Sequence, residues 1–237
     1  VAPHLARKHT PTGSSVILVT PDSQRTMFTY LGACRDLEPA DVDTALLRSA
    51  RVFHTTGYMW DTPNQERAAR EAVDAARRAH TLVSFDVADP FVVQRYHGSL
   101  SAWIPGNVDL LFANEEELRA LTGAEGDAEQ IARAASALAA TVVMKVGARG
   151  CMIVEDGSIA TVGPHPATRS DTTGAGDAFA AGYLFGLLQK LTTEQCAAVA
   201  NIVAGSIVSV DGCNYDALDE PDVRSALTDV MASGTGR

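Results

Sequence analysis

The sequence lacks the marks of a membrane protein and of a general nucleic-acid binder. A membrane helix needs roughly 18–20 uninterrupted apolar residues, and the longest apolar stretch, residues 197–210, is interrupted by Asn201, Gly205 and Ser206. Basic side chains are scarce, with 19 Lys and Arg against 29 Asp and Glu, so the net charge is −10. A strongly acidic chain attracts neither nucleic acid nor an anionic membrane surface. We therefore expect no nucleic-acid partner and no membrane partner.

Paired cysteines and a secretory signal are also missing. Cys34, Cys151, Cys196 and Cys213 lie far apart and form no C-x-x-C motif, so the sequence signals neither a zinc site nor a disulfide framework. No secretory signal opens the chain. We expect reduced thiols in a cytoplasmic protein.

Two common nucleotide-binding motifs are absent as well. No G-x-x-x-x-G-K-[ST] occurs, which argues against a P-loop kinase. No G-x-G-x-x-G follows an early strand with an acidic residue about 20 positions later, which argues against a dinucleotide-binding dehydrogenase. The acidic balance leaves anionic ligands open, because the backbone N–H groups at the start of a helix bind phosphate on an acidic protein.

The composition is that of a folded chain with a real core. Of its 237 residues, 46% are hydrophobic and 20% are charged, which excludes a disordered or fibrous chain. This length corresponds to one large domain, or to one domain with a small appendage. No internal repeat and no long linker divides it. We predict a single domain over residues 1–237.

Strands alternate with helices along most of the sequence. Strands are expected at residues 52–55, 82–85, 108–112, 141–146, 151–154 and 159–162. Helices are expected from about residue 37–41 to 49, and at 62–79, 115–121, 127–140, 174–190, 193–210 and 221–231. This alternation predicts an α/β fold whose mostly parallel sheet has helices on both faces. Near the start, strands at 16–20 and 25–30 around a turn at 21–23 predict an antiparallel hairpin at one edge.

The strongest local signal for chemistry is the segment Asp171-Thr-Thr-Gly-Ala-Gly-Asp177, at the start of a helical run. A helix start exposes unpaired N–H groups and the positive end of the helix dipole, and Gly174 and Gly176 let a ligand approach the backbone closely. The pattern indicates an anion hole for a phosphate in transfer, beside which Asp177 would take a proton from a hydroxyl. On spacing alone, a plain helix entry with Asp177 as a dipole partner fits equally well.

This segment, continued by Ala178, Phe179 and Gly182, resembles the D-T-x-G-A-G-D signature of the ribokinase-like (PfkB) carbohydrate and nucleoside kinases. The resemblance extends from about Thr12 to the C-terminus. It implies a ribokinase-like three-layer α/β/α fold with a small β lid hairpin at residues 12–33.

The resemblance assigns the catalytic roles within the motif. Asp177 matches the catalytic base, and Gly174, Ala175 and Gly176 match the anion hole. Asp171 and Thr173 match positions that often hold a monovalent cation in potassium-activated members, so K⁺ is a further expected cofactor.

Three further segments match the family in order and spacing. They supply the expected ATP-binding residues Asn114, Lys145, Gly147, Gly150 and Asn201. Glu117, with Asn114, matches the Asn-x-x-Glu that positions Mg²⁺ and phosphate, usually through water. Taken alone, Asn114 and Glu117 would also fit a helix cap with a solvated Glu, and the two glycines an ordinary turn.

These matches predict a kinase that moves the γ-phosphate of ATP to an alcohol group. Residues 19–27 and 57–61 resemble an adenosine kinase-like subgroup, so adenosine or a related nucleoside is the expected substrate, with a sugar such as ribose or fructose as the alternative. Asp86 follows a strand end, where ligands of α/β proteins collect; it fits either a functional carboxylate or surface charge.

One part of the family pattern has no counterpart here. The family's N-terminal third, with its first strand, a Gly-Gly segment and an Asp that binds substrate hydroxyls, is not found, so the sequence is expected to be N-terminally incomplete. A catalytically inactive nucleotide-binding protein is therefore the alternative class of function. Family dimers often form through the lid hairpin, which makes a homodimer a further expectation.

Overall fold

The computed structural model describes residues 4–20, 25–168 and 171–233. The chain divides into two compact units, residues 1–84 and 85–237. Whether these act as one domain, as the sequence suggests, stays a prediction. Within the described residues, no helix has both the length and the apolar character needed to cross a membrane.

The first unit begins with a two-stranded antiparallel sheet. Strand β1 (Thr12–Val19) pairs with β2 (Arg25–Gly32), and the register runs from Thr12 opposite Gly32 to Val19 opposite Arg25. The predicted hairpin is confirmed, although β1 begins earlier than residue 16. The turn predicted at residues 21–23 lies outside the described residues.

Three helical segments replace the single helix that was expected up to residue 49. Two short 3-10 turns, Ala33–Asp36 and Pro39–Asp41, precede α1 (Thr44–Ser49). Asp43 caps α1 by accepting from the N–H groups of Ala45 and Leu46, so the helix cannot extend back to Pro39.

The rest of the first unit follows the prediction closely. Strand β3 (Val52–Thr56) leads to α2 (Pro63–Arg78), and β4 (Leu82–Asp86) follows, with its last two residues in the second unit. Thr62 caps α2 by accepting from the N–H of Gln65, and Pro63 occupies the first turn, where no N–H is needed. The small apolar side chains of α2 are buried, as their helical spacing predicts.

In the part of the chain that the structure describes, six strands form the main sheet, in the order β3-β4-β5-β6-β7-β8. The second unit supplies β5 (Leu110–Asn114), β6 (Thr141–Lys145), β7 (Cys151–Glu155) and β8 (Ser158–Val162). β5 and β6 are parallel, with Asn114 opposite Lys145, whereas β6, β7 and β8 form an antiparallel meander. The sheet is mostly parallel, as predicted.

The described residues of the second unit form six α-helices. They are α3 (Pro90–Trp103), α4 (Glu115–Thr122), α5 (Ala128–Ala135), α6 (Ala175–Leu188), α7 (Thr193–Val208) and α8 (Pro221–Ala232). α3 was not predicted; it bends at Tyr96, whose φ of −121° and ψ of 20° are not helical, so its two halves do not share one helical period. α5 ends several residues before the expected position 140.

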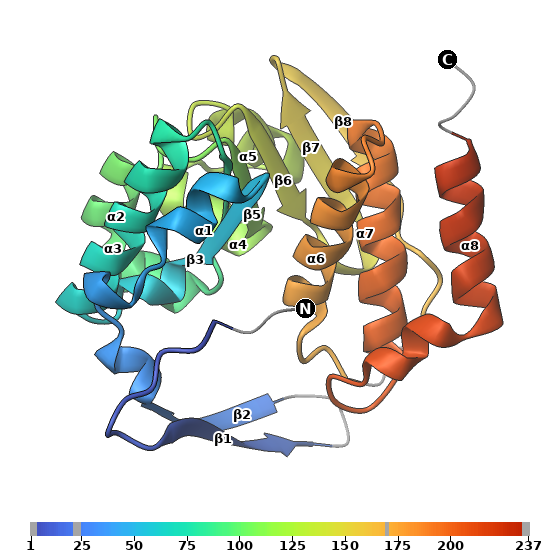
Figure 1. Cartoon of the computed structure of the whole chain (residues 1–237). Coiled ribbons are helices and arrows are strands. Elements are labelled where there is room, and N and C mark those ends of the chain that lie inside the picture. Colours follow the sequence, from blue (N-terminus) through green and yellow to red (C-terminus); the bar gives the residue numbers. More distant parts are fainter. Residues whose placement is uncertain (1–3, 21–24, 169–170, 234–237) are drawn as a thin grey trace. The chain divides into compact units, whose positions relative to one another are not determined.

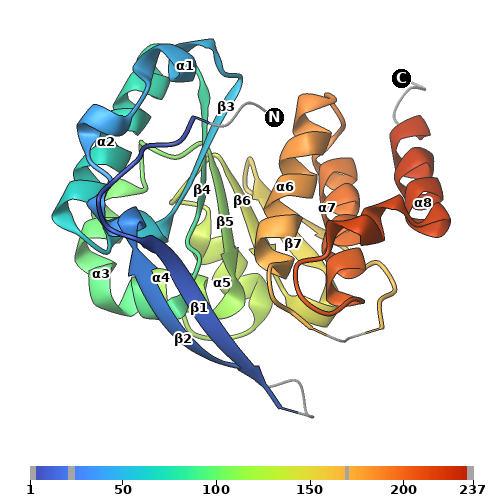
Figure 2. The ribbon, with the colours of Figure 1, turned by 60° about the horizontal axis from the view of Figure 1, so that its bottom comes forward.

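Helices α6 and α7 lie side by side on one face of β6 and β7, with α4 and α5 on the other face (Figures 1 and 2). Glycines allow this close approach, since a Cβ on Gly182 would lie 2.9 Å from the Cα of Ala200. Phe112 on β5 meets the rings of Phe179 and Tyr183 edge-to-face, at centroid distances of 6.2 and 5.3 Å. These contacts fix the N-terminal turn of α6.

Candidate functional site

The start of α6 is open. Gly174 occupies the N-cap position in the left-handed conformation, with φ 76° and ψ 0°, and no side chain among the described residues caps the helix. A Cβ on Gly174 would lie 2.6 Å from the Sγ of Cys213. Both the backbone angle and this neighbour therefore demand glycine. The predicted cluster of N–H groups at Gly174, Ala175 and Gly176 begins a real helix, with the positive end of its dipole exposed.

Asp171 shapes the loop that leads into this helix. Its Oδ1 accepts hydrogen bonds from the backbone N–H of Thr173, at 2.8 Å, and from the Thr173 hydroxyl, at 2.7 Å. Its Oδ2 accepts from the N–H of Gly212 at 3.2 Å. Asp171 thus joins the motif to the segment after α7. The monovalent-cation role of Asp171 and Thr173 stays a prediction.

Asp177 lies in the first turn of α6 and is exposed. The two residues that follow it, Ala178 and Phe179, are buried in the core. The helix therefore holds the carboxylate at a fixed place beside the open turn, accessible from outside. This position suits a group that must reach the hydroxyl of a bound ligand.

A cavity of about 510 Å³ lies against the same helix turn. Its lining includes the predicted residues Lys145, Gly147, Gly150, Ala175, Gly176 and Asn201. These residues come from four segments, the end of β6, the turn after it, α6 and α7, which only the fold brings together. Phe179, Ala204 and Val208 add apolar surface. A cavity with apolar walls and a few polar groups is the usual form of a small-molecule site.

The turn after β6 requires its glycines. Residues Gly147–Arg149 form a single 3-10 turn, closed by the N–H of Gly150, which donates to the carbonyl of Gly147 at 3.0 Å. Gly150 has φ +88°, and a Cβ there would lie 2.2 Å from the carbonyl oxygen of Val162. The local geometry of Gly147 and Gly150 is thus that of an ordinary turn, which was one of the two interpretations of these glycines. The same turn also borders the cavity.

Asn201 is a buried residue in the lining of the cavity, where it supports the loop after β8. Its Nδ2 donates to the carbonyl of Gly163 at 2.8 Å and to that of Val162 at 3.3 Å. The amide donors of this side chain are therefore used within the protein. Asn201 shapes the cavity wall, and a direct contact with a nucleotide stays a prediction.

Asn114 and Glu117 form a reciprocal cap at the start of α4. The Glu117 carboxylate accepts from the backbone N–H and from the Nδ2 of Asn114, both at 2.7 Å, while Asn114 Oδ1 accepts from the Glu117 N–H at 2.8 Å. The cap interpretation is confirmed, but the solvated-Glu interpretation is wrong, because Glu117 is only 2% exposed. Neither residue lines the cavity.

Burial changes the acidity of Glu117. Loss of solvent raises the pKa of this carboxyl to about 7, and the charges of Asp86 and Asp89 act in the same direction. The Lys145 charge and the hydrogen bond from the Asn114 backbone act against the rise. The Glu117 carboxyl therefore changes its charge near neutral pH.

Lys145, the last residue of β6, connects the cavity to a buried carboxylate. Its Nζ lies 2.7 Å from the Oδ2 of Asp86, and the two side chains are 18% and 5% exposed. The same Nζ lies 3.5 Å from the place a Cβ would take on Gly176. Asp86 is therefore not surface charge, which was one of its two interpretations. Its position at the end of β4 was the available signal.

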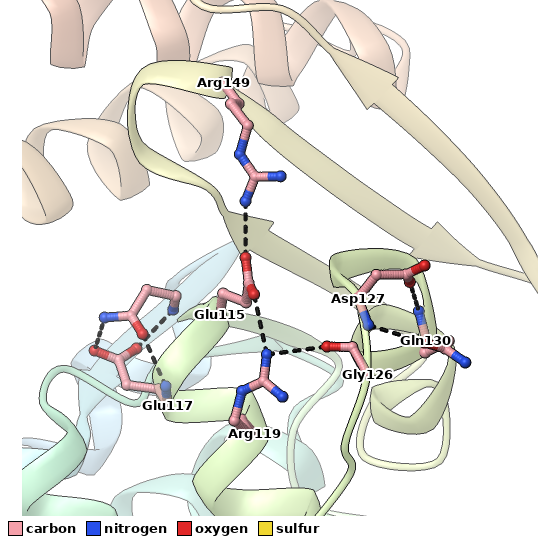
Figure 3. Close-up of polar contacts among 8 residues, drawn as sticks. Glu115, Glu117, Arg119, Gly126, Asp127, Gln130 and Arg149 are labelled. Atoms are coloured by element: carbon pink, nitrogen blue, oxygen red, sulfur yellow. Dashed lines mark hydrogen bonds and ion pairs between the residues drawn. The ribbon is translucent and has the colours of Figure 1, made fainter.

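A charged link joins the turn beside the cavity to α4 (Figure 3). Glu115 accepts from Arg149 at 2.8 Å through one carboxylate oxygen and from Arg119 at 3.2 Å through the other. Arg119 also donates to the carbonyl of Gly126 at 3.2 Å. The sequence reasoning did not identify this link, because its partners lie up to 34 positions apart.

The chain resembles known proteins over most of its length. An adenosine kinase from Sinorhizobium meliloti shares 32% identity and superimposes with a TM-score of 0.83, covering 94% of this chain and 66% of that one. A probable sugar kinase from Rhizobium etli CFN 42 shares 31% identity, with a TM-score of 0.84 and coverage of 90% and 66%. Adenosine kinase 1 of Arabidopsis thaliana is 26% identical over 232 residues, covering 90% of this chain and 65% of that one.

These solved structures confirm the ribokinase-like fold predicted from the sequence. The chain spans just under two thirds of the length of these relatives. Residues 1–220 match the family described as pfkB family carbohydrate kinase. Since this match includes the hairpin, the sheet and the start of α6, the chain belongs to the pfkB family of carbohydrate kinases.

Proposed function

We propose that this chain carries the nucleotide-binding and catalytic part of an ATP-dependent kinase that phosphorylates an alcohol group. The observation that carries the proposal is the open start of α6. Its residues Ala175 and Gly176 line the same cavity as Lys145, Gly147 and Gly150. Family membership supports the same interpretation.

The roles of the residues follow from their positions. Asp177 takes the proton of the acceptor hydroxyl, whose oxygen forms a bond to the γ-phosphorus while the bond to the ADP oxygen breaks. The N–H groups of Gly174, Ala175 and Gly176 stabilise the charge on the transferred group, although the Ala175 N–H donates to the carbonyl of Thr172 at 3.2 Å and must turn from it to the phosphate. Phosphoryl transfer requires positioning and charge stabilisation more than covalent help, and an open helix start supplies both.

Mg²⁺ is proposed to be positioned by Asn114 and Glu117 through water. Carboxylate and amide oxygens are suitable for this ion, which keeps several of its waters when bound to protein. Both oxygens of Glu117 already accept hydrogen bonds from Asn114, which fits contact through water better than direct ligation. When bound, Mg²⁺ neutralises charge on the phosphates. At Asp171 and Thr173, K⁺ would share a carboxylate that already accepts three hydrogen bonds.

Adenosine or a related nucleoside is the proposed acceptor, and a sugar is the second candidate. Two of the similar proteins are adenosine kinases, while the third is a probable sugar kinase and the family description names carbohydrate. A cytoplasmic location and a homodimer belong to the same proposal. The four cysteines are free thiols, which agrees with a reducing compartment.

The direct test is phosphoryl transfer by the purified chain. We would incubate it with ATP, Mg²⁺ and K⁺ and a panel of adenosine, other nucleosides, ribose and fructose, and measure phosphorylated products by mass spectrometry. Asp177→Asn is expected to lower transfer by about 10²–10⁴-fold, the usual worth of a general base, while ATP binding is retained. Asp222→Asn is the matched control, since Asp222 is also exposed in the first turn of a helix.

Each result has a definite meaning. Product from one acceptor, lost in Asp177→Asn and kept in Asp222→Asn, establishes the kinase and names its substrate. Product that survives Asp177→Asn overturns the assignment of the base. ATP binding without product from any acceptor would favour the alternative of a nucleotide-binding protein without catalysis.

A further inference from the structure

Lys145 has a position that its sequence pattern does not explain. It ends β6 opposite Asn114 of β5, and its side chain lines the cavity together with Ala175 and Gly176. Its Nζ is the nearest atom to the place of a Cβ on Gly176, at 3.5 Å. A positive charge therefore lies next to the positive end of the α6 dipole, where like signs repel unless an anion joins them.

Asp86 holds that ammonium in place. Its Oδ2 lies 2.7 Å from the Lys145 Nζ, and its Oδ1 accepts from the backbone N–H of Ala88 at 2.9 Å. Ala88 has φ +78°, a left-handed conformation that is unfavourable for a residue with a side chain. Strain of this kind persists where the surrounding structure requires it, commonly at functional sites. Both oxygens of the buried carboxylate are thus fixed.

We propose that Asp86 is a positioning residue that holds the Lys145 ammonium ready to bind the terminal phosphates of the nucleotide at the start of α6. The inference rests on the proposed nucleotide site and adds to it a charge–phosphate contact and the residue that orients it. A lysine side chain loses much rotamer freedom when a ligand immobilises it. Because Asp86 has already fixed the Nζ, phosphate binding does not bear that cost.

The role predicts an effect on the phosphates and none on the base or sugar. We would measure the binding of ATP and of AMP by isothermal titration calorimetry. Lys145→Met is expected to weaken ATP binding about 10- to 100-fold, the range of a hydrogen bond to a charged group, and to leave AMP binding unchanged. Asp86→Asn is expected to weaken ATP binding about 10-fold, again without effect on AMP. Lys145→Arg keeps the charge and is expected to restore most of the ATP affinity.

Lys8→Met is the matched control. Lys8 forms an ion pair with Asp41 at 2.6 Å, and its side chain is 16% exposed, close to the 18% of Lys145. Its loss should lower the melting temperature and leave both nucleotide affinities unchanged. This variant separates the general cost of breaking a half-buried ion pair from a contact with phosphate.

A double-mutant cycle decides whether Asp86 acts through Lys145. In the Lys145→Met background, Asp86→Asn should cause no further loss of ATP affinity, since no ammonium remains to be positioned. This background also removes the uncompensated charge that would make the single Asp86→Asn variant hard to fold. An additional loss of ATP affinity in the double variant would overturn the positioning role.

Other results also overturn the inference. One is an equal loss of ATP and AMP affinity in Lys145→Met. The other is a lower melting temperature with both affinities unchanged. Either result would mean that the ion pair is purely structural. The test does not depend on turnover. A chain that binds ATP but transfers no phosphate would contradict the proposed kinase and still decide the role of Lys145, whereas a chain that binds neither nucleotide would overturn both.

Discussion

Two helices of the second unit differ in whether a side chain accepts hydrogen bonds from the N–H groups of their first turn. At the start of α4, Asn114 and Glu117 cap each other, so side chains of the protein take the exposed donors. At the start of α6, Gly174 has no side chain to offer, and no other described side chain takes its place. The first arrangement stabilises a helix. The second leaves the positive end of a helix available to a ligand.

The other described helices show which arrangement is the exception. α1, α2, α3, α5 and α7 all begin with a side chain that accepts from the first turn. α8 has no such cap, but it begins with Pro221, which has no N–H to satisfy. α6 instead begins with a left-handed glycine against Cys213, a local departure of the kind that a functional site accounts for.

Closing the open start should have the largest effect. In Gly174→Ala, the backbone keeps a φ that is unfavourable for alanine. The new Cβ would also lie 2.6 Å from the Cys213 Sγ, so the turn must shift. We expect phosphoryl transfer to fall by about 10²–10³-fold, the effect of losing one donor of an oxyanion hole. Transfer rates and ATP affinity of the variant measure this.

Gly123→Ala controls for backbone strain alone. Gly123 ends α4 with φ +69°, similar to Gly174, and has open space where a Cβ would be. Its replacement should lower the free energy of unfolding by about 1–2 kcal/mol without changing ATP affinity. Equal losses of ATP affinity in the two variants would show that the open start of α6 is not special.

The capped start of α4 should make the stability of the chain depend on pH, through Glu117. The pKa of Glu117 is about 7 in the folded chain against an ordinary 4.5, so between these values the folded state binds the extra proton. The free energy of unfolding therefore falls as the pH rises from about 5 to 8, by about 2 to 3 kcal/mol from this group. Glu117→Gln removes the titration, so its stability relative to the parent chain should rise by this amount over the same interval.

Urea unfolding at pH 5 and pH 8 in the presence of EDTA measures the difference. Glu116→Gln is the control, because Glu116 occupies the same helix turn and is exposed. It should change the two free energies equally. If Glu117→Gln does the same, Glu117 is not the group that burial makes sensitive to neutral pH.

Local patterns predicted most of what distinguishes these two helix starts. The spacing of Asn114 and Glu117 predicts a cap, and the glycines of the Asp171–Asp177 segment predict an exposed helix start, because both depend on residues within a few positions of one another. The alternation of strands and helices predicted the sheet for the same reason. The missed helix, α3, has a bend at Tyr96 that interrupts its local pattern.

Contacts between distant residues could not be predicted in this way. Asp86 and Lys145 are 59 positions apart, and only the fold places the ends of β4 and β6 close enough for an ion pair. Burial has the same limit. Glu117 belongs to a run of three glutamates, a pattern that is typical of a solvated helix face. Packing nevertheless leaves the Glu117 side chain only 2% exposed.

Removing a cap should cost more at α4 than at an ordinary helix. Thr192 caps α7 by accepting from the Gln195 N–H at 3.3 Å, and Thr192→Ala should cost about 1 kcal/mol of stability. Asn114→Ala removes a comparable cap and also the donor at 2.7 Å from the buried Glu117 carboxylate, so about 2 kcal/mol or more is expected. Urea unfolding at pH 8 compares them, and equal costs would contradict the coupling of cap and carboxylate.

The smallest effect is expected from the link between α4 and the cavity turn. Arg149 is 66% exposed and Glu115 is 30% exposed, so Arg149→Ala should cost less than about 1 kcal/mol and change ATP affinity less than about threefold. Arg133→Ala, which removes a similarly exposed pair on α5, is the control. High salt should abolish both small losses, since about 1 M salt shortens the screening length to about 3 Å. A tenfold loss of ATP affinity in Arg149→Ala alone would mean that this arginine holds the cavity turn for the nucleotide, and α4 would then serve the ligand through Glu115 despite its closed start.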